Sequence, residues 1–335
     1  MSRIVVTGGA GFLGSHLCET LTARDDEVVC VDDLSTGRLD NIRHLLASPS
    51  FTFLQADVSA GLEVRGRIDA VAHLASPASP PDYHRRPLET LAVGSRGTEH
   101  ALRLAALHEA RFVLASTSEV YGDPAVHPQH EEYWGNVNPI GPRSVYDESK
   151  RFAEALTSAY RRTMDVNTGV LRIFNTYGPR MRPHDGRVVT SFITQALCGT
   201  PLTIYGDGTQ TRSFCYVDDL IRGIAAMIDA VEPGPVNLGN PREYTVAELA
   251  DLVLAITDSP SVIEYHRLPT DDPTRRQPDI GRARSVLNWS PKVDVEEGLR
   301  RTVEWFRTRP EEVSAAAVAV AGEQFEGRHR TPVLS

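Results

Sequence analysis

The segment Tyr146-Asp-Glu-Ser-Lys150 places a phenol and an ammonium group four residues apart. Residues four apart share one face of a helix, so these two side chains are expected to lie next to each other. An ammonium group beside a phenol favours the phenolate and lowers its pKa from an ordinary value of about 10. Tyr146 is then suited to act as a general base toward the proton of an alcohol.

A second polar group follows the apolar run Phe112–Ala115, where Ser116, Thr117, Ser118 and Glu119 are consecutive. If that run is a strand of a parallel sheet, these residues emerge at its carboxyl end. Ligands of doubly wound folds bind at that edge. The sequence therefore predicts that this group and Tyr146 face one cavity.

A glycine-rich turn follows the apolar run Ile4–Thr7, in the segment TGGAGFLGSHL. Gly8 allows a tight turn, Gly11 lets the backbone approach a pyrophosphate, and Gly14 lets the next helix pack closely on the strand. The phosphates would then lie on amides at the N-terminus of a helix. The pattern predicts a dinucleotide site.

Asp32 ends the second apolar run, where an acid accepts hydrogen bonds from the adenine ribose and repels a 2′-phosphate. NAD is therefore favoured over NADP, although Arg38 lies nearby and could serve a phosphate. Lys150 is expected to reach the nicotinamide ribose. The cofactor residues of this half are predicted as Gly8, Gly11, Phe12, Leu13, Gly14, Asp32, Asp33, Leu34, Ser35, Thr36, Gly37 and Arg38, together with Tyr146 and Lys150.

The elements that must position these residues alternate along the first 175 residues. Apolar runs of strand length alternate with helical segments such as Leu88–Glu109 and Tyr146–Arg162, and this alternation predicts an α/β fold with a Rossmann-type, doubly wound parallel sheet. The strand-length runs are Ile4–Thr7, Val28–Val31, Phe51–Leu54, Ala70–Leu74, Phe112–Ala115 and Val170–Ile173. We expect an NAD-binding domain over 1–175, a smaller, irregular substrate-binding region over 176–310 that returns some elements to the sheet, and a surface helix and tail over 311–335.

Composition excludes several classes of partner. The chain has 335 residues, 41% hydrophobic and 24% charged, and its net charge of −9 argues against a nucleic-acid partner. No run approaches the roughly 20 apolar residues of a membrane span. Because the start Met-Ser-Arg is followed directly by an apolar strand, we expect no signal peptide.

Cysteine and histidine usage adds two expectations. Cys18, Cys30, Cys198 and Cys215 form no Cys-x-x-Cys pair, which indicates reduced thiols and a cytoplasmic protein. His127 and His130 lack a second pair of ligands, so we expect no metal site.

Taken together, the glycine turn, the Ser/Thr group and Tyr-x-x-x-Lys resemble the extended short-chain dehydrogenase/reductases that act on nucleotide sugars. Within that superfamily the chain is similar to the UDP-glucuronate decarboxylases, or UDP-xylose synthases, over roughly Arg3 to Arg309. The segments that carry the resemblance are HLASPASPPDY (73–83), STSEVYGDPAVHPQHEEYWGNVNPIGPRSVYDESKR (116–151), RIFNTYGPRM (172–181), DGRVV (185–189), PLTIYGDGTQTRSFCYVDDL (201–220) and DDPTRRQPDIGRA (271–283).

The resemblance implies roles that spacing alone does not give. Thr117, Tyr146 and Lys150 would form the redox triad, with Ser118, Glu119 and Arg276 also catalytic. It further implies cofactor loops and a substrate pocket. The loops are Asp57 and Val58 beside adenine and Leu74, Ala75 and Ser76 under the dinucleotide; the pocket residues are Glu119, Tyr146, Asn175, Arg187, Val189, Tyr205, Gln210, Arg212 and Arg276.

The arginines also agree with the chemistry of such a ligand. A UDP-sugar acid carries a pyrophosphate and a carboxylate, and arginine supplies permanently charged, bidentate donors to both. The acidic chain places Arg180, Arg187, Arg212 and Arg276 in the segments expected to form the pocket.

The chain departs from the family pattern at three places. Thr90-Leu91-Ala92-Val93-Gly94 stands where the family usually has Thr-Leu-Lys-Thr-Asn, Ser149 replaces a glycine, and Ser191 replaces an asparagine. The first and third departures bear on the detailed sugar contacts. None removes the redox triad.

The reaction implied is NAD-dependent decarboxylation of UDP-glucuronate to UDP-xylose, through a transient 4-ketone and return of hydride to C4. The alternatives are release of the UDP-4-keto-pentose with NADH, a 4-epimerase or a 4,6-dehydratase. Dehydratases generally have Asp-Glu where this chain has Ser118-Glu119, and epimerases usually lack the glutamate. A remote alternative is a catalytically silent NAD-sensing scaffold on the same fold.

The resemblance also implies a homodimer that forms through a four-helix interface. The helices concerned are those over Leu88–Glu109 and Tyr146–Arg162. The second offers Phe152, Leu156 and Ala159 at helical spacing.

Overall fold

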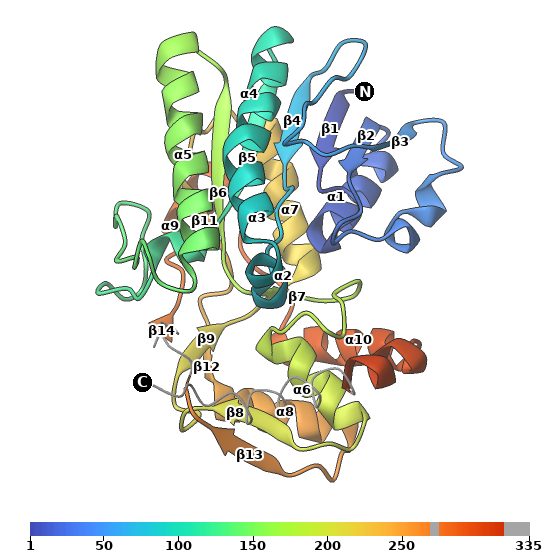
Figure 1. Ribbon diagram of the computed structural model, residues 1–335, viewed down its shortest axis with the longest axis vertical. Helices are drawn as coiled ribbons and strands as arrows, with labels where there is room; N and C mark the ends of the chain where they lie inside the picture. Colours follow the sequence, from blue (N-terminus) through green and yellow to red (C-terminus); the bar gives the residue numbers. More distant parts are fainter. Residues whose placement is uncertain (269–274, 318–335) are drawn as a thin grey trace, which may run out of the picture.

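A seven-stranded parallel sheet forms the centre of the computed structural model, which describes residues 1–268 and 275–317 (Figure 1). The strand order is β11-β6-β5-β4-β1-β2-β3, and every neighbouring pair is parallel. The strands are β1 (Arg3–Thr7), β2 (Glu27–Asp32), β3 (Phe51–Gln55), β4 (Ala70–His73), β5 (Arg111–Thr117), β6 (Thr168–Ile173) and β11 (Val236–Leu238). The predicted doubly wound sheet is confirmed.

The central strands are apolar because both faces of the sheet are covered. In β1, Ile4 and Val6 pack into the core on one face, whereas Val5 packs into the core on the other. All seven residues of β5 are buried. Such strands become near-continuous apolar runs in the sequence, which is why they could be located without the structure.

Helices cover each face of the sheet. α1 (Phe12–Ala23) and α7 (Val217–Asp229) contribute to the core on the Ile4 face, and α4 (Thr98–Leu107) and α5 (Ser144–Met164) contribute to the core on the Val5 face. α5 contains the predicted helix Tyr146–Arg162.

The helix predicted over Leu88–Glu109 is divided into three parts. α3 (Pro87–Ala92) is followed by a π-helical turn, η3 (Val93–Gly97), and then by α4. Gly94 and Gly97 both lie in this turn. Glycine in a helix costs about 1 kcal/mol relative to alanine, so the regular α-helical geometry gives way here.

The C-terminal elements form a separate layer below the sheet in Figure 1. Three helices pack there, with two small sheets of strand order β13-β8 and β12-β9-β14. These elements are α6 (Val188–Leu197), α8 (Val246–Thr257), α10 (Val295–Arg307), β8 (Leu202–Tyr205), β9 (Thr211–Ser213), β12 (Glu243–Thr245), β13 (Ile263–His266) and β14 (Arg275–Arg276).

The remaining helices and strands are short. They are η1 (Leu39–Asn41), η2 (Arg43–Leu45), α2 (Pro80–Arg85), η4 (Ser118–Tyr121), β7 (Thr176–Tyr177), β10 (Cys215–Tyr216) and α9 (Gly281–Leu287). β7 and β10 pair in parallel. β11 belongs to the central sheet although it lies in the predicted substrate-binding region, and the domain boundary at residue 175 stays a prediction.

Residues 310–317 pack on the C-terminal layer. Residues 310–317 are helical, and Val313 and Ala316 are 3% and 5% exposed. Part of the predicted tail, residues 318–335, lies outside the described residues, as do 271–274 of the matching segment 271–283.

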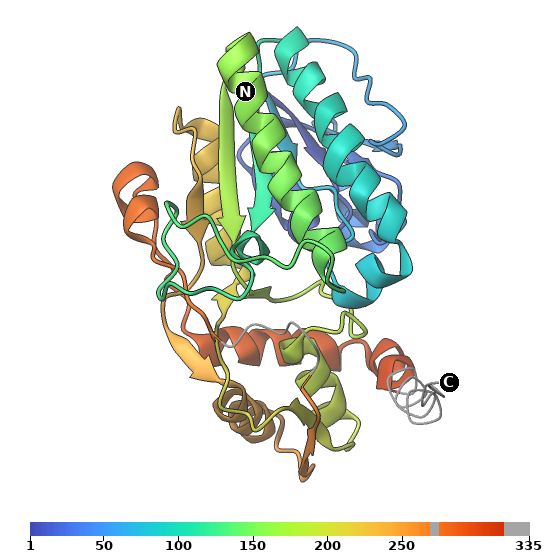
Figure 2. The same ribbon diagram turned by 60° about the vertical axis from the view of Figure 1, so that its left-hand side comes forward.

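The carboxyl ends of the central strands face the C-terminal layer, as the two views show (Figures 1 and 2). Ligand sites of doubly wound sheets lie at this edge. Over residues 1–268 and 275–317, no helix is both long and apolar enough to span a membrane.

Candidate active site

A cavity of about 1120 Å³ lies between the carboxyl edge of the sheet and the C-terminal layer. It brings together residues from the glycine turn, from the end of β5, from α5 and from β14. All predicted catalytic and substrate-binding residues line it, as do all predicted cofactor residues other than Leu34 and Gly37. Among the latter, Asp57, Val58, Leu74, Ala75 and Ser76 form one wall, and Ser76 Oγ is buried without a hydrogen-bond partner among the described residues.

The glycine turn has the close contacts that a dinucleotide cradle needs. Gly8 has φ +71°, and a Cβ there would lie 2.8 Å from the Ala75 backbone. A Cβ on Gly14 would lie 2.0 Å from the Gly8 carbonyl oxygen. Gly11 caps α1 without any side-chain hydrogen bond, so the first amides of the helix are left for a ligand. These features fit a pyrophosphate.

Asp32 is fixed by the loop that follows it. Its Oδ2 accepts a hydrogen bond from Ala10 N (2.9 Å) and its Oδ1 accepts one from Leu34 N (2.8 Å). A Cβ on Gly37 would lie 2.6 Å from Oδ1. Leu34 and Gly37 therefore wrap around Asp32 instead of lining the cavity, where the sequence placed them. Burial raises the pKa of Asp32, against the hydrogen bonds from Leu34 and Ala10.

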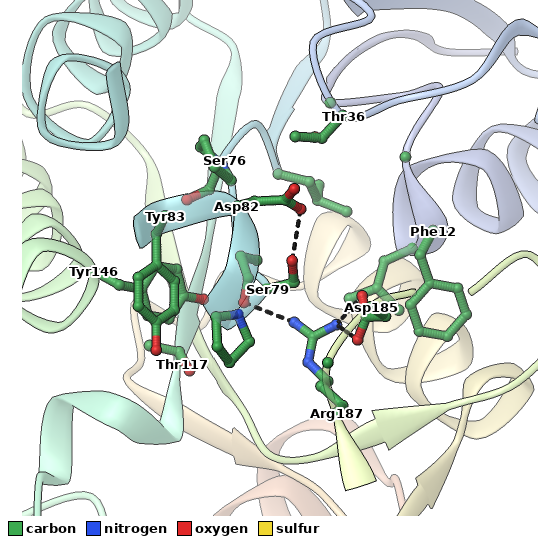
Figure 3. A pocket seen from close by; sticks show the side chains of 18 of the residues that line it. Phe12, Thr36, Ser76, Ser79, Asp82, Tyr83, Thr117, Tyr146, Asp185 and Arg187 are labelled. Atoms are coloured by element: carbon green, nitrogen blue, oxygen red, sulfur yellow. Dashed lines mark hydrogen bonds and ion pairs between the residues drawn. The ribbon is translucent and has the colours of Figure 1, made fainter. Parts of the chain in front are cut away.

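Tyr146 and Lys150 lie on the same face of α5, at the cavity. The Tyr146 ring stacks on Tyr83 with ring centroids 5.3 Å apart and an interplanar angle of 10° (Figure 3). Lys150 Nζ donates a hydrogen bond to Ala115 O (2.9 Å) and lies 5.9 Å from the centroid of the Tyr146 ring.

The prediction that Lys150 lowers the pKa of Tyr146 is wrong for the protein alone. Burial raises the pKa of this phenol well above its ordinary value, and the charge of Arg187 and a hydrogen bond from Thr117 offset only part of that effect. Burial also lowers the pKa of Lys150 to about 8, although Glu154 opposes the change. Desolvation acts on both groups and favours their neutral forms.

Glu119 is held between two guanidinium groups. Its Oε2 accepts a hydrogen bond from Arg143 Nη2 (2.6 Å), and its Oε1 accepts one from Arg276 Nη1. Burial by itself raises the pKa of Glu119, but the charges of Arg276 and Arg143 outweigh it and lower the pKa to about 2. Glu119 is thus a permanent carboxylate next to Tyr146 and Ser118 in this structure.

The far wall of the cavity carries further ion pairs. Arg187 donates to both oxygens of Asp185 (2.9 and 3.0 Å; Figure 3). It also donates to Ala78 O (2.8 Å). Asp82 accepts hydrogen bonds from Ser79 Oγ (2.6 Å) and from Arg182. This wall therefore holds two acid–arginine pairs around one opening.

The remaining predicted substrate residues, Asn175, Val189, Tyr205, Gln210 and Arg212, also line the cavity. Gln210 Nε2 donates to Tyr205 O (2.5 Å), and Arg212 Nη1 donates to Thr211 O (2.9 Å). Tyr205 is 43% exposed, so its ring is available at the cavity mouth.

Two of the departures from the family pattern are in contact. A Cβ on Gly94 would lie 2.7 Å from Ser149 Cβ, so η3 approaches α5 closely at this point. Ser191 lines the cavity. The Gly94–Ser149 contact lies directly beside Lys150 in the sequence.

Sequence reasoning missed several residues of the site. Arg143, Tyr83, Asp82 and Asp185 line the cavity. Asp147 follows Tyr146 in the sequence, and burial together with the charge of Glu119 raises the pKa of its carboxyl group to about 7. Arg143 and Asp147 could have been predicted as site residues, because they lie close to Tyr146 in the sequence. Tyr83 could not, because it reaches Tyr146 from α2, far away in the sequence.

The chain is similar in sequence to known enzymes. Residues 4–239 match the model of the NAD dependent epimerase/dehydratase family. UDP-glucuronic acid decarboxylase 1 of Arabidopsis thaliana is 51% identical over 92% of this chain and 70% of its own length. The protein of the same name in Xenopus tropicalis is 50% identical over 91% of this chain and 72% of its own length.

Solved structures share the fold across nearly their full length. UDP-glucuronic acid 4-epimerase from Bacillus cereus, in complex with UDP-glucuronic acid and NAD, has a TM-score of 0.81 and 29% identity, over 91% of this chain and 99% of that one. The dTDP-glucose 4,6-dehydratase DesIV from Streptomyces venezuelae, with NAD bound, has a TM-score of 0.83 and 30% identity, over 92% and 97%.

Proposed function

We propose, from the premise that this chain belongs to the NAD-dependent epimerase/dehydratase family, that it converts UDP-glucuronate to UDP-xylose and carbon dioxide with bound NAD. The position of Arg276 carries the proposal. Its side chain is 3% exposed and forms a salt bridge with Glu119. It lines the same cavity as Ser118 and Tyr146. A buried cation at the reacting centre suits a substrate that carries a carboxylate there.

The residues that line the cavity fit NAD, and some of them would bind it while others act on the sugar. The glycine turn would hold the pyrophosphate, Asp32 the adenine ribose and Lys150 the nicotinamide ribose. NAD+, when bound, supplies the acceptor for the hydride of the sugar C4. Tyr146 takes the proton of the C4 hydroxyl, and Thr117 orients that hydroxyl by hydrogen bonding.

Decarboxylation then needs no metal as electron sink, because the C4 ketone is β to the C5 carboxylate. The C5–carboxylate bond breaks, carbon dioxide leaves, and the electron pair becomes an enolate on the ketone oxygen. Tyr146 and Thr117 would lie next to that oxygen and stabilise it. A proton then adds to C5, and Tyr146 returns its proton to the C4 oxygen as hydride returns to C4.

Arg276 is suited to hold the carboxylate before the bond breaks. A guanidinium group is a poor proton donor, so the C5 proton is better delivered by a water molecule bound beside Arg276. Ser118 and Glu119 would orient the ring through its hydroxyls. Asn175, Arg187, Tyr205, Gln210 and Arg212 would bind the UDP portion.

The assembly we propose is a homodimer through α3, α4 and α5. Leu88 and Leu91 on α3 are 76% and 41% exposed, and Phe152 on α5 is 51% exposed. Apolar side chains on neighbouring helices support burial against a second copy. We also propose a cytoplasmic location, which the four free cysteines support.

The function is tested by incubating purified protein with UDP-glucuronate and a catalytic amount of NAD+. We expect carbon dioxide and UDP-xylose, identified by mass and NMR. If NADH accumulates in step with carbon dioxide, the product is UDP-4-keto-pentose instead of UDP-xylose. Faster epimerisation of UDP-glucose or UDP-galactose than decarboxylation of the acid would contradict the assignment.

A further inference from the structure

The two arginines that hold Glu119 differ in how they are attached to the fold. Arg143 immediately precedes α5, and its carbonyl oxygen accepts hydrogen bonds from Tyr146 N (3.1 Å) and Asp147 N (3.2 Å). Its place is therefore fixed by the first turn of the helix that carries Tyr146. Arg276 comes from β14, a two-residue strand on the opposite side of the cavity.

They also differ in the donors that they have left. Arg276 Nη2 donates to Gly122 O (3.2 Å), but its Nε is buried and has no hydrogen-bond partner within 1–268 and 275–317. A buried N–H without a partner is costly, and such groups commonly point to a missing ligand. Arg276 thus has a donor for a second carboxylate, whereas Arg143 Nη2 is committed to Glu119 Oε2.

Charge balance makes this difference useful. Without Arg143, Glu119 would depend on Arg276 alone, and a buried carboxylate that loses its only cation is strongly unfavourable. A carboxylate substrate would then have to compete with Glu119 for one guanidinium. With Arg143 present, Glu119 keeps one ion pair while Arg276 interacts with the ligand.

We propose that Arg143 is a positioning residue that retains Glu119, so that Arg276 can turn to the carboxylate of the sugar. The inference rests on the proposed function, in which the substrate carries that carboxylate. It assigns selectivity for acidic sugars to a pair of arginines on opposite sides of one glutamate. Arg276 provides the contact, and Arg143 makes that contact available.

The test is a binding cycle in the Tyr146→Phe background with NAD+ bound, where turnover is blocked. Calorimetry compares UDP-glucuronate with UDP-glucose, which has the same UDP and no carboxylate. Arg143→Ala should weaken UDP-glucuronate about tenfold and change UDP-glucose less than about twofold. Arg143→Lys should recover part of the loss, because it restores the charge with a single donor.

The decisive variant is Glu119→Gln combined with Arg143→Ala. A neutral side chain at 119 no longer claims Arg276, so this variant should bind UDP-glucuronate as tightly as Glu119→Gln alone. Arg162→Ala is the matched control, since Arg162 lies near the other end of α5 and its Nη1 bonds Ser158.

Two outcomes would overturn the inference. Equal weakening of UDP-glucose and UDP-glucuronate by Arg143→Ala would mean a merely structural role at the start of α5. Weak UDP-glucuronate binding that persists in the combined variant would mean that Glu119 is not the competitor. If Arg143→Ala does not fold, the Lys variant decides by the same ratio. The proposed function fails separately, when wild-type protein releases no carbon dioxide from UDP-glucuronate.

Discussion

The cofactor half and the sugar half of the cavity are lined by different chemical groups. The cofactor half is made of backbone: a turn with Gly8 at φ +71°, a helix N-terminus capped by Gly11, and one carboxylate, Asp32, held by amides. The sugar half is made of long charged side chains, with Glu119, Arg143 and Arg276 brought together from segments far apart in the sequence. Position is thus fixed by steric fit in one half and by charge in the other.

This difference matches the chemistry of the two ligands. A dinucleotide that stays bound needs a rigid cradle of backbone donors, which costs no reorganisation. A sugar acid that loses its carboxylate needs charges that can change partners during the reaction. We expect substitutions in the two halves to separate cofactor binding from carbon dioxide release.

Tyr146→Phe should have the largest effect, because Tyr146 lies at the junction of the halves. Removal of the phenolic oxygen leaves no base for the C4 proton, and turnover should fall by about a thousandfold or more. The affinities for NAD and UDP should stay unchanged, since the ring still stacks on Tyr83. Turnover and calorimetry measure the two effects; near-normal turnover would remove Tyr146 from the mechanism.

Arg276→Ala should lower the rate of carbon dioxide release about a hundredfold, or about 3 kcal/mol, and leave NAD affinity unchanged. The reason is that Arg276 belongs wholly to the sugar half. Glu119→Gln should also slow turnover, with little change in UDP affinity. A matching loss of NAD affinity in Arg276→Ala would show that the halves are not independent.

Asp32→Ala tests the other half. Lost hydrogen bonds to the ribose should weaken NAD about tenfold, while UDP affinity and the rate at saturating NAD+ stay close to wild type. Fluorescence titration of NAD gives the first quantity. Unchanged NAD affinity would mean that the adenosine portion lies elsewhere.

The smallest expected effect is the pH dependence of stability through Glu119. Its pKa is lowered from 4.5 to about 2, so its ionisation favours the folded state at neutral pH. That contribution is fully present above pH 4.5 and is lost as pH falls toward about 2, in the sense of linkage. Its size should be on the order of 1 kcal/mol.

Urea unfolding of wild type and Glu119→Gln measures this contribution. The difference in unfolding free energy should be constant near neutral pH and shrink below pH 4.5. A difference that does not change with acidity would mean that the two arginines do not hold the carboxylate as the structure indicates.

Most residues predicted for the cofactor half line one cavity, and they could be picked out from the sequence because the geometry of this half is local. Turn, helix N-terminus and acid follow one another within Gly8 to Asp32, and each glycine has a steric reason that a motif preserves. Leu34 and Gly37 do not line the cavity, because the loop after Asp32 folds them around its carboxylate; their contact with the cofactor stays a prediction.

The sugar half could be predicted only in part. The resemblance supplied Glu119 and Arg276 as separate members of the site, but not their ion pair, because they lie on η4 and β14. The prediction that the pKa of Tyr146 is lowered was wrong for a similar reason. Spacing on a helix places Lys150 near the phenol, but the burial that raises its pKa comes from the whole cavity.

In the proposed reaction, hydride leaves C4 and returns to it while carbon dioxide is lost from C5. Turnover of UDP-glucuronate in D2O with catalytic NAD+ tests it most directly, by NMR of the sugar product. We expect UDP-xylose with one deuterium at C5, from the solvent, and protium at C4, from the returned hydride. Recovery of a six-carbon uronic acid epimer that lacks deuterium at C5, without carbon dioxide, would contradict it.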